Sequence, residues 1–143
     1  CEAVWELRRE FYYSLKATGL TKLNEDVVVP RSKLVDLVRF AQRLAEETGI
    51  AVACFGHAGD GNIHTNLMVD GYEDPAIRAR AHQALDILFA WVLEHGGAIT
   101  GEHGIGLAKA RWLGDALGET SLHIHRDIKD TLDPHRILTP GTW

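Results

Sequence analysis

The sequence predicts an α+β fold in which helices cover one face of an antiparallel sheet. Two segments, 31–48 and 75–94, carry apolar residues at helical spacing, and glycine follows each of them. Short β-branched or alternating runs flank both segments, with Gly, Pro and Asp at the turns. The resulting order, strand-helix-strand-strand-helix-strand, is the ferredoxin-like βαββαβ pattern, here with flanking N- and C-terminal helices.

The first half of the chain begins with a predicted helix over residues 2–16. Its apolar side chains recur at helical spacing, and Gly19 ends it. Residues 27–29 form a β-branched run, which predicts a short strand. Pro30 ends that strand and suits the first turn of the helix over 31–48.

The second half begins with two strands around a glycine-rich turn, and a long helix opened by Asp74–Pro75 follows them. A fourth strand then leads into a glycine-rich loop and two short helices. The predicted bounds of these elements are 50–55, 63–69, 75–94, 98–100, 108–116 and 119–131. In the usual strand order of this fold, 4-1-3-2, both long helices cover one face of the sheet.

The opposite face of the predicted sheet is partly polar. Alternation directs one set of side chains to the helices: Val52, Cys54, Leu67 and Val69. The other set faces away: Phe55, His57, His64, Asn66 and Met68. A sheet face with this composition needs a ligand or another domain to cover it.

The composition is that of one globular domain. The chain has 143 residues, of which 45% are apolar and 24% charged, so a disordered tail, a collagen-like chain and a coiled coil are excluded. No run approaches the roughly 18 apolar residues of a membrane span. The net charge of −5 disfavours a nucleic-acid partner.

The cysteines and the first residues suggest a piece of a larger intracellular protein. Cys1 and Cys54 are too few for a disulfide framework, so we expect a reducing compartment. The expected location is cytoplasmic, with peripheral attachment to a membrane left open. Because the sequence begins without Met and leads directly into a helix, we expect it to be cut from a longer chain.

The segment 56–64 places two histidines on a hairpin. Asp60–Gly61 is a signal for a two-residue type I′ turn, and symmetric pairing about it sets His57 opposite His64. Directly paired residues share a face with Cβ atoms about 4.5–5.5 Å apart, so both imidazoles can bind one metal ion. The alternative is a pair of polar residues at a solvated hairpin end.

The loop 101–106 supplies a second group at the same end of the predicted sheet. Glu102 can provide a third, oxygen ligand, and two histidines with one carboxylate are typical of a catalytic metal site with open positions. His103 is a candidate general base because its ordinary pKa is about 6.5. The alternative is a surface turn. Lys109 is expected in a solvated helix start.

Segments across the whole chain resemble the C-terminal domain of FAD-linked oxidases. Residues 56–66 match the G-H-x-G-D-G-N-x-H-x-N signature of that family, and residues 101–106 match its G-E-H-G-x-G signature. Residues 26–31 are similar to its D-x-x-V-P-R segment, and residues 5–8 to its W-x-x-R segment. The family includes glycolate oxidase flavoprotein subunits, D-lactate dehydrogenases and D-2-hydroxyglutarate dehydrogenases.

The resemblance implies an FAD-dependent enzyme that oxidises a D-2-hydroxy acid to the 2-oxo acid. It assigns a divalent metal (Zn²⁺, Mn²⁺ or Fe²⁺) to His57, His64 and Glu102, and the base role to His103. Arg8 and Asn66 would bind the substrate, since a guanidinium fork suits a carboxylate. The chain would be the substrate or cap domain, inactive alone, and its partner the missing domain that binds most of the FAD.

The chain departs from the family pattern in its tail. Thr139 stands where the family has an Asn near the flavin, and Thr142 stands in place of a Lys, so no flavin contacts are assigned here. Two other functions stay open: a metal-dependent hydrolase, and a non-catalytic binding or assembly module of the same fold. The sequence names neither the electron acceptor nor the metal, and homo-oligomerisation is left open.

Overall fold

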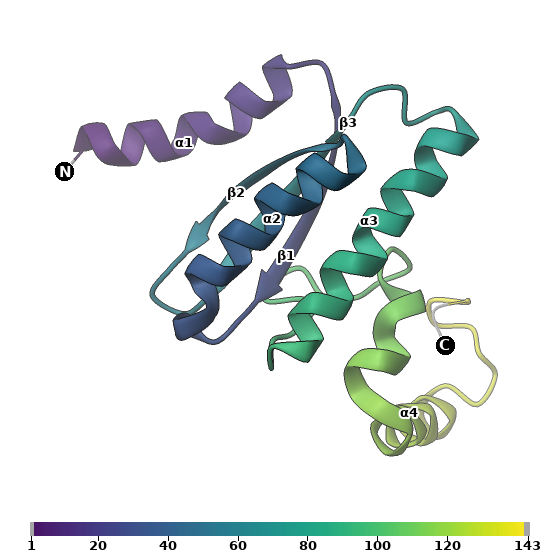
Figure 1. The fold of residues 1–143 in the computed structure, drawn as a ribbon. Helices are drawn as coiled ribbons and strands as arrows, with labels where there is room; N and C mark the ends of the chain where they lie inside the picture. The colour runs from purple at the N-terminus through teal and green to yellow at the C-terminus, as the bar shows by residue number, and fades with distance from the viewer. Residues whose placement is uncertain (1, 142–143) are drawn as a thin grey trace.

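The computed structural model describes residues 2–141, so Cys1 and Thr142 lie outside the described residues. It confirms the α+β class, with helices on an antiparallel sheet (Figure 1). The helices are α1 (Glu2–Ala17), α2 (Leu34–Thr48), α3 (Pro75–Glu94) and α4 (Leu113–Leu132). The strands are β1 (Thr21–Val28), β2 (Ala51–His57) and β3 (Asn62–Val69). Short 3₁₀ turns at Arg31–Lys33 and Ala110–Trp112 precede α2 and α4.

The sheet has the order β1-β3-β2, and both pairings are antiparallel. Figure 1 shows α2 and α3 side by side over one face of it, as predicted, and α1 and α4 at opposite ends of the molecule. Asp74 caps α3 by accepting a 2.7 Å hydrogen bond from the Ala76 N–H, and Pro75 occupies the first turn. α2 ends at Gly49, which has a positive φ.

The core lies between the sheet and the helices. Leu67 and Val69 are buried in it, and Val52 and Cys54 pack against it, which confirms the predicted alternation. The helices add their apolar faces, and the largest side chains that they bury fully are Leu37, Leu44, Leu88, Phe89 and Val92. The ring of Phe89 packs edge-on against Trp112, with centroids 4.6 Å apart.

The fourth strand predicted at 98–100 is wrong as a strand. Ala98 makes one isolated bridge to Val28, on the side of β1 away from β3, which keeps the predicted 4-1-3-2 position. In a regular antiparallel ladder the next hydrogen bond would run from the Thr100 N–H to the Asp26 carbonyl. Instead the N–H of Gly101 donates to that carbonyl, at 2.9 Å. The extra residue is a bulge, so the ladder stops where the chain turns toward the Asp26 side chain.

Two further differences concern lengths. β1 starts at Thr21 and not at residue 27. Residues 21–26 are mostly polar and have low strand propensity, but pairing with β3 keeps them in the strand. The two predicted C-terminal helices are joined in α4, which contains non-helical backbone at Gly118. The break predicted between them is therefore present as a kink.

The predicted register of the hairpin is wrong by two residues. Phe55 lies opposite His64 and His57 opposite Asn62, so residues 58–61 form the turn. The turn closes through N–H groups of Asp60 and Gly61, which both donate to the His57 carbonyl. A shift of two residues preserves the face on which each side chain lies, so His57 and His64 remain on the same side of the sheet, now diagonal.

Gly61→Ala is expected to destabilise the protein by about 1–3 kcal/mol, because alanine disfavours its backbone conformation. Gly61 has φ +83°, and an added Cβ would lie 2.1 Å from the Val29 carbonyl oxygen. Gly59→Ala, in the same turn, meets nothing within 4 Å and is the matched control. Urea unfolding of both variants measures the difference, and equal midpoints would contradict the turn geometry.

The described part of the chain has no helix that combines the length and apolar character of a membrane span. α1 nevertheless exposes several large apolar side chains, among them Leu7, which is 64% exposed, and Phe11, which is 48% exposed. Phe11 still contacts the polar face of the sheet through Phe55, with ring centroids 5.9 Å apart.

Candidate functional site

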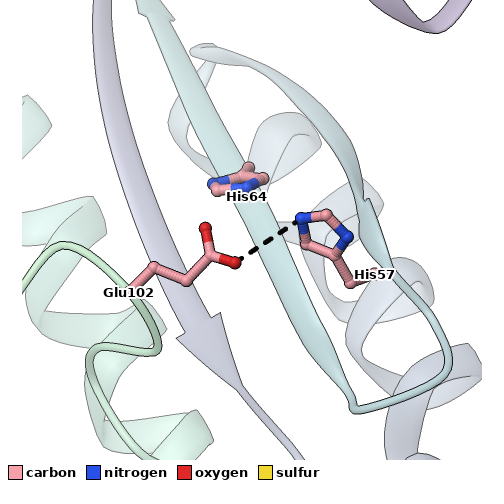
Figure 2. A group of neighbouring side chains, drawn as sticks. All are labelled: His57, His64 and Glu102. Carbon is pink, nitrogen blue, oxygen red and sulfur yellow. Dashed lines mark ion pairs between the residues drawn. The ribbon is translucent and has the colours of Figure 1, made fainter.

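Side chains of His57, His64 and Glu102 converge above the end of the β2–β3 hairpin. Figure 2 shows the two imidazoles and the carboxylate pointing into one space from β2, β3 and the loop after α3. One nitrogen or oxygen from each residue lies within 4.8 Å of the others. Glu102 Oε1 stands 3.6 Å from His57 Nε2. The predicted convergence of these groups is therefore present in the fold.

Arg8 also reaches this site, from α1. Its Nη2 lies 3.3 Å from Nε2 of His57, and its guanidinium lies 5.6 Å from the Trp5 ring centroid. The same Nη2 lies 3.5 Å from His57 Nδ1, so the guanidinium meets both ring nitrogens and does not lie along the lone pair of either one. Arg8 therefore rests against the His57 ring at the edge of the site.

His64 has two features that suit a metal ligand: a ring nitrogen left unpaired in the described part of the chain, and a lowered pKa. Its Nδ1 is buried and finds no hydrogen-bond partner among the described residues. Burial, and then the proximity of His103, lower the pKa of His64, which favours the neutral ring that binds metals. Two ligands of one ion at about 2.1 Å lie no more than about 4.2 Å apart, so small side-chain rotations bring this set to bonding distance. The residues fit a divalent cation.

The backbone of the Glu102 loop is anchored on a buried carboxylate. Asp26, opposite His64 on β1, has no exposed surface. Its Oδ2 accepts hydrogen bonds from three successive N–H groups, of Gly101 (2.9 Å), Glu102 (2.5 Å) and His103 (2.9 Å). Such a set of amides around one oxyanion is a nest that stabilises the charged form.

Lys109 provides the countercharge, and its expected place in a solvated helix start is wrong. The residue is 5% exposed, and Nζ contacts Asp26 Oδ1 (2.9 Å), the Ile99 carbonyl (2.7 Å) and Glu25 Oε2 (3.3 Å). The first two contacts are hydrogen bonds, and Glu25 adds a second carboxylate as an ion pair. Lys109 is a buried structural cation and not a surface charge for an incoming anion.

The pKa of Asp26 reflects these contacts. Burial alone would raise it, but the hydrogen bonds from Lys109 and from the backbone of residues 101–103 outweigh burial and hold the pKa of this carboxyl well below its usual range. The charged form of Asp26 is therefore part of the folded structure.

Folding stability is expected to fall on acidification through Asp26. A carboxyl whose folded pKa is depressed stabilises the fold above its unfolded pKa, about 3.9, and this contribution is lost as the pH falls toward the folded value. In Asp26→Asn the slope of unfolding free energy against pH below about 4 should be shallower. Urea midpoints from pH 5 to pH 2 measure it, and parallel curves for both proteins would contradict the assignment.

His103 stands between Asp26 and His64. Its Nδ1 lies 3.6 Å from Asp26 Oδ1, and its ring stacks on that of His64 with centroids 5.4 Å apart. A carboxylate on the Nδ1 side favours the tautomer with the proton on Nδ1, which leaves Nε2 as the basic nitrogen. The side chain is 43% exposed, so it is accessible from solvent.

Asn66 lies deeper than the other candidates. It is fully buried on β3, and its Nδ2 donates to the carbonyls of Ala53 (3.1 Å) and His64 (3.0 Å). Its Oδ1 is buried with no partner among the described residues. In this orientation of its amide, Asn66 can therefore act toward a ligand only as an acceptor, and only if the side chains above it move aside.

The structure thus brings five of the six predicted site residues to one rim, and Asn66 lies beneath it. Sequence reasoning missed Asp26 as an anchor and Lys109 as its partner. The available signal was a carboxylate directly before the buried run 27–29, in a position where a strand seldom holds an unpaired charge.

The chain is thus an α+β domain with two histidines, a carboxylate and a further histidine at one rim, which form a candidate metal site. The chain belongs to the family of FAD linked oxidases, C-terminal domain, whose model matches residues 1–143.

Similar proteins include D-lactate dehydrogenases and a glycolate oxidase subunit of several organisms. The chain is 34% identical over 137 residues to D-lactate dehydrogenase of Anaerostipes hadrus, covering 96% of this chain and 29% of that protein. It is 36% identical over 139 residues to glycolate oxidase subunit GlcD of Bacillus subtilis, covering 97% and 29%. With the mitochondrial D-lactate dehydrogenase [cytochrome] of Arabidopsis thaliana it shares 33% over 140 residues, covering 96% and 24%. The chain therefore spans less than a third of the length of these relatives.

Proposed function

We propose that this chain is the substrate-side domain of an FAD-dependent oxidoreductase that oxidises a D-2-hydroxy acid, such as glycolate or D-lactate, to the 2-oxo acid. The printed names of the relatives, D-lactate dehydrogenase and glycolate oxidase subunit, support this substrate class. In this proposal most of the FAD is held by a further domain, outside these 143 residues.

The observation that carries the proposal is the composition of the rim. A cation site of His57, His64 and Glu102 adjoins a histidine and an arginine, His103 and Arg8. A 2-hydroxy acid offers a hydroxyl, a carboxylate and a C–H bond, and these residues match the first two groups. His103 and Glu102 are both exposed, so a small ligand can reach them from solvent.

In the proposed reaction His103 acts as the general base. Its Nε2 takes the proton of the C2 hydroxyl as the C2–H bond breaks with its electron pair, and the 2-oxo acid results. Arg8 binds the substrate carboxylate through its guanidinium fork. Asn66 is proposed to contact the substrate from beneath the rim. Its Oδ1 can only accept, and the single hydroxyl proton of the substrate goes to His103, so this contact needs a rotated amide whose Nδ2 donates to the substrate oxygen.

The two groups that the chain does not itself provide have defined tasks. FAD, when bound, supplies the hydride acceptor, and a divalent cation held by His57, His64 and Glu102 lowers the free energy of developing negative charge on the substrate oxygen. Arg8 contacts the His57 ring beside this cation site, so a substrate carboxylate held by Arg8 would lie next to the cation.

The test uses the full-length protein that contains this domain. Its visible flavin spectrum should bleach on anaerobic addition of one or more of glycolate, D-lactate and D-2-hydroxyglutarate, and much less with L-lactate. Glu102→Gln should weaken metal binding and slow bleaching. Glu47→Gln, an exposed change on α2, is the control.

Two outcomes would contradict the proposal. Hydrolytic turnover with metal and without flavin would favour a metal-dependent hydrolase. Unchanged bleaching rates in His57→Ala, His64→Ala and Glu102→Gln would mean that this rim takes no part in the reaction.

A further inference from the structure

We propose that Asp26 and Lys109 are positioning residues. They set the positions of the Glu102 and His103 side chains by fixing the backbone of residues 101–103, which carries both. This inference rests on the proposed function of those two side chains. It concerns groups that touch neither substrate nor cofactor in that function, since both lie beneath the rim.

The geometry shows why one carboxylate can place both side chains. Asp26 holds the N–H groups of Gly101, Glu102 and His103 on a single oxygen, which fixes the orientation of three consecutive peptide planes. From this backbone Glu102 extends to within 3.6 Å of His57, and the ring of His103 stacks on His64. Displacing the peptide planes would move both groups together.

Packing from the hairpin side reinforces the same placement. A Cβ added to Gly101 would lie 2.6 Å from Nδ2 of the buried Asn62, so the loop backbone already touches the start of β3. The loop is therefore held between the Asp26 carboxylate and the strand that carries His64. Both contacts, with Asp26 and with Asn62, are made by groups of the folded domain itself.

Lys109 makes the anchor possible. A carboxylate without exposed surface is strongly destabilising unless it is paired and hydrogen-bonded. The Lys109 ammonium supplies the charge and also ties in the Ile99 carbonyl, two residues before Gly101. Lys109 thus holds the backbone at Ile99, and Asp26 holds it at residues 101–103.

A second acid–lysine pair, with a buried acid and a partly exposed lysine, provides a control far from the rim. Asp133 is 4% exposed, binds Lys129 Nζ at 2.6 Å, and accepts from the N–H groups of Ile137 (2.9 Å) and Leu138 (3.0 Å). It has the same chemistry as Asp26 but anchors the C-terminal tail. Loss of a buried anchor in general would affect both pairs alike, whereas a positioning role is specific to Asp26.

The experiment compares Asp26→Asn with Asp133→Asn in the full-length protein. Amide hydrogen exchange of residues 101–103 is measured first, and the affinity and visible spectrum of Co²⁺ second. In Asp26→Asn we expect loss of exchange protection in the loop, a Co²⁺ dissociation constant raised about 10–100-fold, as is typical when a group that orients metal ligands is removed, and an altered Co²⁺ spectrum. The flavin reaction should lose kcat with little change in KM, because Arg8 is unaffected. Asp133→Asn should match the unmodified protein in all of these.

The outcomes separate this inference from the proposed function. If the unmodified protein binds no Co²⁺, the metal site fails, and exchange in the loop still decides the inference. Equal exchange and equal Co²⁺ binding in Asp26→Asn and Asp133→Asn would overturn it. If Asp26→Asn does not fold, the double variant Asp26→Asn/Lys109→Met, which buries no unpaired charge from this pair, replaces it, with Asp133→Asn/Lys129→Met as its control.

Discussion

His103→Asn is expected to lower the kcat of the full-length protein about 10²–10⁴-fold, the usual contribution of a positioned general base. Asparagine retains hydrogen-bonding capacity near Asp26 but cannot take up a proton in the neutral pH range. Since His103 is not among the three proposed ligands, Co²⁺ affinity should change little. Stopped-flow measurement of flavin reduction at saturating substrate gives the rate directly.

His123→Asn is the control for this prediction. His123 is exposed on α4 and has no part in the proposed reaction. A rate for His103→Asn equal to that of the unmodified protein would remove His103 from the chemistry, and an equal loss in both variants would indicate a general effect on folding. A large rise in KM without loss of kcat would instead indicate a role for His103 in substrate binding.

Lys109→Met is expected to destabilise the fold by about 3–5 kcal/mol, because it leaves the buried Asp26 carboxylate without its cation. The methionine keeps most of the apolar stem and loses the contacts of Nζ, which also lies over the Phe89 ring, 5.6 Å from its centroid. The loss therefore comes mainly from the ion pair. The free energy of unfolding from urea titration at pH 7 measures it.

Lys33→Met tests the same change at an exposed pair. Lys33 Nζ lies 3.5 Å from Asp36 Oδ2, and both side chains are more than 40% exposed, so the loss should stay within about 1 kcal/mol. Comparable losses at both positions would mean that Lys109 is not the cation on which the Asp26 site depends.

The sequence carried enough information to predict the class of fold and the face of each hairpin residue. Helical periodicity and turn residues identified α2 and α3, because both are local signals. The register was predicted two residues off, since Asp60–Gly61 favours a two-residue turn, whereas the folded turn spans 58–61 and is fixed by the contact of Gly61 with Val29. That contact is not local, so the sequence of the hairpin alone does not reveal it.

The side chains at the rim could be predicted from the sequence, whereas the buried residues that anchor the loop beneath them could not. His57, His64 and Glu102 have side chains that suit a metal, and their convergence followed from the strand order. The anchoring role of Asp26 depends on backbone N–H groups about 75 positions away, and backbone amides carry no sequence signal. For the same reason Lys109 resembled an ordinary surface charge.

The amide nest on Asp26 has a consequence for how quickly the rim can accept a ligand. Because folding of this domain already restricts the peptides that bear Glu102 and His103, their conformational entropy is lost before any ligand arrives. Association should therefore require little rearrangement of this loop, and its heat capacity change should be small. The arginine on the first helix differs, because its guanidinium contacts the His57 ring and has to turn away from it before it binds a substrate carboxylate.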